Sequence, residues 1–85
     1  MTAAAAGAKS KYAVFLRTES FRRAMALAGF RSEYALSKAM GLNRSSVKRV
    51  RAGESMPGPG FIAGALKALA PMAFEDLFEV DVSEE

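Results

Sequence analysis

The feature that most constrains this chain is the stretch from residue 33 to residue 53, EYALSKAMGLNRSSVKRVRAG. Apolar residues recur at helical spacing on both sides of Gly41. These residues are Leu36, Met40, Leu42, Val47 and Val50. The pattern predicts two short amphipathic helices joined by a tight turn, because glycine takes the left-handed conformation without strain. Ser37 is small and lies where the two helices would cross.

Residue types that favour helix ends stand at the expected ends of these two helices. Ser32 is expected to cap the first helix, with Leu36, Ala39 and Met40 on its inner side. Asn43 is expected to cap the second helix, which Gly53 ends.

The remaining residues of the second helix follow from its geometry. If Val47 and Val50 are buried, the helical repeat of 3.6 residues per turn places four other residues on the side away from the core. These are Arg44, Ser45, Lys48 and Arg49, with Asn43 and Ser46 near the N-terminal edge. Such a basic side is either a solvated helix face or the docking surface for a polyanion.

Further elements are expected on both sides of this stretch. Residues 1–10 are Ala-rich and predict a flexible arm. Lys9 in this arm and Lys11 just after it either follow a DNA groove or are simply solvated. Residues 11–17 are ambiguous between strand and helix, because Phe15 interrupts an alternating pattern. A helix is predicted over about residues 19–28, capped by Thr18 or Ser20, with Phe21, Ala24, Met25 and Ala28 on one face and Gly29 after its end.

The C-terminal third contains a loop, two helices and a possible strand. GESMPGPG, residues 53–60, predicts the loop, so the next helix should begin near Phe61 and turn Phe61, Ala65, Leu66 and Leu69 inward. PMAFEDLF predicts a last short helix with Pro71 at its first position. FEVDV, residues 78–82, alternates as a strand does, and it can pair with residues 12–16 within one chain or between two chains.

Composition excludes most catalytic and metal chemistry. The chain of 85 residues has no Cys and no His. Disulfides, Cys/His zinc sites and nucleophiles activated by His are therefore excluded, and no loop has the ligand spacing of a calcium site. We expect no enzyme activity, no cofactor and no metal. The chain lacks the apolar stretch of a signal peptide or of a membrane span, so a cytoplasmic protein with no membrane partner is expected.

Charge is distributed unevenly along the chain. Residues 1–53 contain eleven Lys and Arg against Glu19 and Glu33, a net charge of +9, whereas residues 54–85 contain Lys67 against seven acids, a net charge of −6. A basic half with an acidic tail is frequent in nucleic-acid-binding proteins, although solubility alone can produce it.

Several of these marks together resemble the phage-repressor helix-turn-helix domains, the lambda-repressor-like or Xre family. The marks are LSKAMGLNRSSVKRVRAG, then Pro57, then ALKALA, then EDLF, and the similarity covers about residues 20–78. It implies a mainly α, five-helix domain over residues 11–82, with the helix-turn-helix at 33–52, short terminal strands where 11–17 and 78–82 are extended, and an acidic end at 83–85.

The resemblance also implies functional positions. Residues in the base-reading positions are Asn43, Arg44, Ser45, Ser46 and Arg49. Phosphate contact or support of the reading helix is implied for Glu33, Lys38, Lys48 and Arg51. Arg51 departs from the family, which often has a glutamate there that pairs with an arginine of the first helix. The internal ion pair is therefore in doubt, and contact of Arg51 with DNA is the alternative.

The expected function is site-specific binding of double-stranded DNA by a homodimer at an inverted-repeat operator, as a transcriptional repressor of the phage, plasmid or mobile-element type. The dimer contact is expected in residues 11–17 and 78–82, where Tyr12, Phe15 and Phe78 serve either a dimer surface or simple packing. Two alternatives are kept: an antitoxin that masks a toxin or another protein partner through its acidic tail, and an architectural or excision factor with low sequence preference.

Overall fold

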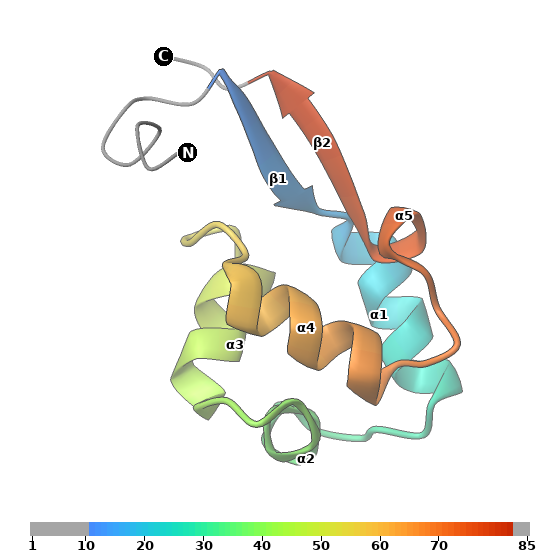
Figure 1. The fold of residues 1–85 in the computed structure, drawn as a ribbon. Helices are drawn as coiled ribbons and strands as arrows, with labels where there is room; N and C mark the ends of the chain where they lie inside the picture. The colour runs from blue at the N-terminus through green and yellow to red at the C-terminus, as the bar shows by residue number, and fades with distance from the viewer. Residues whose placement is uncertain (1–10, 83–85) are drawn as a thin grey trace.

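The computed structural model describes residues 11–82, which form five helices and a two-stranded sheet (Figure 1). The expected arm at 1–10, with Lys9, and the expected acidic end at 83–85 lie outside the described residues. In chain order the elements are β1 (Tyr12–Leu16), α1 (Thr18–Leu27), α2 (Glu33–Met40), α3 (Arg44–Arg51), α4 (Pro59–Ala68), α5 (Phe74–Leu77) and β2 (Phe78–Val82). The mainly α class with short terminal strands is confirmed.

The two strands settle the ambiguity at both ends of the domain. β1 and β2 pair antiparallel within one chain, in a register that sets Tyr12 opposite Val82 and Leu16 opposite Phe78. Residues 12–16 are therefore a strand, despite the irregular Phe15. Phe78 is fully buried, whereas Tyr12 is exposed, so of these two aromatic residues only Phe78 belongs to the core.

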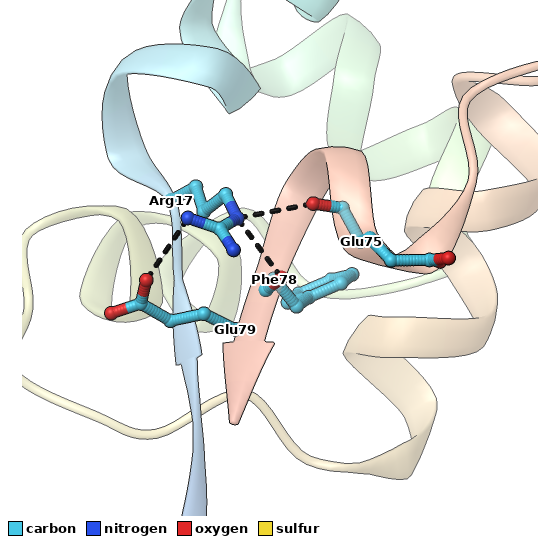
Figure 2. Close-up of polar contacts among 4 residues, drawn as sticks. All are labelled: Arg17, Glu75, Phe78 and Glu79. Carbon is cyan, nitrogen blue, oxygen red and sulfur yellow. Dashed lines mark hydrogen bonds and ion pairs between the residues drawn. The ribbon is translucent and has the colours of Figure 1, made fainter. Parts of the chain in front are cut away.

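Arg17 connects the paired strands to the first helix. Its backbone N–H donates to the Leu77 carbonyl oxygen at 2.8 Å. Its Nε donates to the carbonyl oxygens of Glu75 at 3.0 Å and Phe78 at 3.1 Å, and its Nη1 contacts the Glu79 carboxylate at 3.0 Å (Figure 2). One guanidinium thus binds the start of α1 to the α5–β2 junction, with donors arranged in a fixed fork.

Three aromatic rings from distant parts of the chain meet in the core. Phe21 of α1 stacks on Phe61 of α4 with ring centroids 5.6 Å apart, and Phe61 meets the edge of Phe78 of β2 at 6.2 Å. Around them is one cluster of buried apolar side chains. Its other members are Ala24, Met25, Leu36, Met40, Val47, Val50, Ala65, Leu69 and Leu77.

The predicted ends of the first three helices are largely confirmed. Gly29, Gly41 and Gly53 have φ values of +89°, +72° and +82°, directly beyond α1, α2 and α3. The Ser32 hydroxyl accepts a hydrogen bond from the Ala35 N–H and caps α2. Asn43 occupies the cap position of α3, but its side chain makes no capping hydrogen bond.

The predicted cap of α1 is wrong, although the helix begins within one residue of the predicted start. The cap position is Arg17, and Thr18 is already helical, so neither Thr18 nor Ser20 caps the helix. The Arg22 guanidinium instead donates to the Glu19 carboxylate in the first turn. This hydrogen bond and the positive charge lower the pKa of the Glu19 carboxyl, which favours the ionised form near the positive end of the helix dipole.

Three predictions in the later helices are also wrong. Ala39 is exposed, because α4 and α3 cover only the side of α2 that carries Leu36, Ser37 and Met40. The helix expected from Phe61 begins two residues earlier, since Pro59 is tolerated in a first helical turn. Pro71 lies before α5, which begins at Phe74. At the start of α5, the Asp76 carboxylate accepts a hydrogen bond from the Ala73 N–H at 2.8 Å.

α2 and α4 approach each other closely at Gly64. A Cβ added at Gly64 would lie 2.6 Å from the Met40 carbonyl oxygen and 3.0 Å from the Met40 Cβ. A Cβ at Gly60, one turn earlier in α4, would meet only Leu42 Cδ2 at 3.8 Å. The lack of a side chain at Gly64 therefore sets the distance between α2 and α4.

This difference predicts opposite results for two similar substitutions. Gly64→Ala should lower the free energy of unfolding by about 1–3 kcal/mol, because the backbone of α2 must move to relieve overpacking. Gly60→Ala should be neutral or stabilising, because alanine favours helix and the space is open. Urea denaturation of both variants measures this difference, and an equally destabilised Gly60→Ala would contradict the assigned role of Gly64.

Candidate nucleic-acid interface

α3 has one buried side and one basic side. Val47 is 0% and Val50 7% exposed, and both belong to the core cluster. The predicted buried pair is therefore confirmed. Since these two residues set the rotation of the helix about its axis, the polar residues between them must face outward.

Most predicted base-reading residues lie on that outward side. Asn43, Arg44, Ser45 and Arg49 are exposed, as is Lys48. Ser46 differs, because it is half-buried. It lines a pocket of about 220 Å³ with Phe61 and with the exposed reader Arg49. The structure thus brings four of the five predicted readers to one open surface and turns Ser46 partly inward.

Three of the four cations on α3 have no partner among the described residues. Within residues 11–82, no ion pair or hydrogen bond engages the side chains of Arg44, Lys48 or Arg49. Three cations within six residues repel one another, and only water and salt screen them. An anion that binds here meets preformed positive charge, with no internal ion pair to break.

The turn before α3 is held by backbone and side-chain hydrogen bonds. Gly41 is left-handed, and the Leu42 N–H donates to the Ser37 carbonyl oxygen at 2.9 Å. Ser37 is buried, and its hydroxyl donates to the Tyr34 carbonyl oxygen at 2.8 Å. A larger residue at position 37 would separate the helices, and the serine has a partner for its hydroxyl.

The far end of α3 is held by an ion pair between Glu33 and Arg51. Arg51 Nη1 lies 3.0 Å from Glu33 Oε2, and the side chains are 24% and 26% exposed. This ion pair differs from the family's pair that the sequence left in doubt, because it joins α3 to the first residue of α2 and not to α1. The DNA contact suggested for Arg51 stays a prediction, and this guanidinium is already engaged.

Lys38 shares its surroundings with two residues that the sequence did not single out. Its Nζ lies 5.4 Å from the ring centroid of Tyr34, one turn earlier in α2, in a cation–π contact that their i, i+4 spacing would have suggested. Lys38 and Lys67 of α4 also line one open groove of about 480 Å³ between the two helices. No local signal in the sequence points to Lys67, because the groove exists only when α2 and α4 pack.

Four acidic residues of the C-terminal third lie on α5 and β2. Glu75 and Asp76 are on α5, and Glu79 and Asp81 are on β2. α5 packs on α1, and Figure 1 shows both helices on the other side of α4 from α3. α5 and its two acids are thus separated from α3 by α4, whereas Glu33 begins α2 and Glu54 follows α3.

Two kinds of feature are absent from the part of the chain that the structure describes. Within residues 11–82, no three carboxylates come together as a metal site. In the same residues, the helices lack the length and apolar character of a bilayer span. Comparison of the chain with protein-family models, curated proteins and solved structures gives no match.

The Glu33–Arg51 pair gives a prediction about the support of α3. Glu33→Gln and Arg51→Gln should each destabilise the domain, with a coupling energy of about 1 kcal/mol, because a partly buried charge loses its partner. A double-mutant cycle in urea measures the coupling. The exposed Glu19–Arg22 pair is the matched control and should show a smaller coupling, whereas equal couplings would mean that Glu33 and Arg51 do not hold α3.

Proposed function

We propose that this chain is a sequence-specific, double-stranded DNA-binding transcriptional regulator. α2 and α3 act as a helix-turn-helix of the phage-repressor type, with α3 as the helix that enters the major groove. A homodimer binds an inverted-repeat operator, with recognition helices about 34–36 Å apart to match half-sites one helical turn apart. Repression follows from occupancy, because a bound operator excludes the polymerase.

The two-sided character of α3 carries this proposal. The same short helix buries Val47 and Val50 and exposes three cations without partners in residues 11–82. A solvated basic face usually carries acids among its bases, and α3 has none. A groove of alternating phosphates and base edges matches such a surface in charge and in shape.

Distinct roles follow for the exposed residues. Arg44 and Arg49 present guanidinium forks that match O6 and N7 of guanine. Asn43 and Ser45 stand at the N-terminal end of α3, which lies closest to base edges in this docking geometry, and half-buried Ser46 makes a lesser contact. Lys48, Lys38 and Lys67 bind phosphates, because a flexible ammonium acts as a point charge. Glu33 and Arg51 support α3.

Selection of bound duplexes from random DNA tests the readers. Arg44→Ala and Arg49→Ala should each lose about 1–3 kcal/mol of discrimination at one or two base positions, since each removes a bidentate contact. Arg23→Ala, an exposed arginine of α1, should retain the wild-type preference. If neither α3 variant changes the preferred bases, the reading assignment is wrong. Equal competition by random DNA would instead indicate an architectural factor, and tight binding of a small basic protein without DNA preference would indicate an antitoxin.

Salt dependence tests the phosphate contacts separately. Lys48→Ala should weaken binding to every sequence alike and reduce the slope of log K against log salt by about 0.9, the value for one released counterion. Its base preference should not change. A Lys48→Ala variant with the wild-type slope would exclude a phosphate contact at this position.

A further inference from the structure

The two faces of the β1–β2 ribbon differ in character. The register pairs Tyr12 with Val82, Val14 with Val80 and Leu16 with Phe78. Paired residues of an antiparallel ladder share a face, and successive residues alternate. One face is therefore wholly apolar. The other face holds Ala13, Phe15, Glu79 and Asp81.

The inner end of the apolar face packs against the core, and the outer end is exposed. Phe78 is buried, and Leu16 and Val14 pack against the core. At the outer end, Tyr12, Val80 and Val82 are 57%, 59% and 54% exposed. Figure 1 shows the ribbon extending beyond the helices. A cluster of exposed apolar side chains on a projecting element is typical of an interaction surface.

Within residues 11–82 the sheet has only two strands, so the outer edge of each strand has no partner strand there. Arg17 N–H donates to Leu77 O, so the alternation of the ladder turns the backbone groups of Phe15 and Ala13 toward β2 and those of Val14 and Leu16 outward. The outward groups of β1 can therefore accept another strand, as unprotected edges do.

Charge distinguishes the two edges. Pairing of β2 with β2 of a second copy about Val80 would set Glu79 opposite the partner's Asp81 twice, and like charges directly opposite are destabilising. Pairing of β1 with β1 about Val14 sets Val14 opposite the partner's Val14, and Tyr12 opposite the partner's Leu16, with no charged side chain inside the strand. A β1–β1 contact is symmetric and joins only two copies. Pairing of β1 of one copy with β2 of another would instead leave a free β1 edge and a free β2 edge, to which further copies could add.

A pocket lies where this pairing would bring an aromatic side chain. The pocket has a volume of about 320 Å³ and lies between the end of β1 and the loop after α3. Its lining includes Phe15, Leu16, Thr18, Val50, Met56 and Pro57. Met56 is 53% exposed although apolar. Because the partner's Tyr12 would stand opposite Leu16 on the same face, its ring would reach this pocket and cover Met56, an arrangement that suits an apolar ring with a polar tip.

We propose that the ribbon is a homodimer interface, in which β1 pairs antiparallel with β1 of a second copy about Val14 and each Tyr12 enters the partner's pocket. The inference deepens the proposed function and rests on it for its purpose, since an inverted repeat needs two copies. The contacts themselves involve no base-reading residue of α3, so they can be tested without DNA.

Cysteine crosslinking tests the register, because the chain has no cysteine of its own. V14C should form a disulfide-linked dimer on mild oxidation, since directly paired residues have Cα atoms about 5.5 Å apart and disulfides accept 4.4–6.8 Å. V80C is the matched control on the same face. In the proposed four-stranded sheet its two copies stand three strand spacings apart, roughly 14 Å, and should not crosslink. Crosslinking of V80C but not V14C would overturn the proposal in favour of β2 pairing.

Sedimentation of the DNA-free full chain tests the same contact without cysteines. The wild type should be a dimer at micromolar concentrations, and Tyr12→Ala should weaken the dimer roughly tenfold or more, as loss of a buried tyrosine anchor does. Leu27→Ala, which removes an exposed side chain of α1, should have no effect. A wild type that stays monomeric, or dimers unaffected by Tyr12→Ala, would overturn the proposal. Dimers that select no DNA would refute the proposed function alone.

Discussion

The contact on which the rest of this structure depends is the meeting of Phe21, Phe61 and Phe78. Their rings lie 5.6 and 6.2 Å apart and join α1, α4 and β2, which are far apart in the sequence. Aromatic side chains bury large areas, so three of them can hold a core in so short a chain. α4 thereby becomes a fixed support. α2 packs on it through the close approach at Gly64, and α3 turns its valines into the same cluster.

α3 shows how a short helix can become a rigid surface. Eight residues are too few for a stable isolated helix. Its start is held by the turn at Gly41, its middle by Val47 and Val50, and its end by the ion pair from Arg51 to Glu33. Each contact leaves the outward side untouched. In the proposed function, this restraint fixes Arg44 and Arg49 before DNA arrives, which lowers the entropic cost of binding.

The two proposed surfaces use different elements, and Arg17 fixes one of them, the ribbon, to the rest of the domain. Its guanidinium holds the α5–β2 junction against the start of α1, so the ribbon leaves the domain in a defined direction. A dimer formed through β1 would leave the outward side of α3 available. The direction of the ribbon would then set the separation of the two α3 helices, and with it the spacing of operator half-sites.

The sequence by itself determined the features that arise within a few residues. Helical spacing gave the rotation of α3, glycines marked the ends of three helices, and alternation identified residues 78–82 as a strand. Contacts between distant residues were decided only by the tertiary structure. Periodicity at 11–17 was ambiguous until β2 paired with it, Ala39 looked buried until α4 covered another side of α2, and Arg51 had no known partner until Glu33 came within 3.0 Å. The groove that joins Lys67 to Lys38 likewise needs two packed helices. The physical reason is that backbone preferences act over one or two turns, whereas ion pairs, burial and strand partners depend on which segments the core brings together.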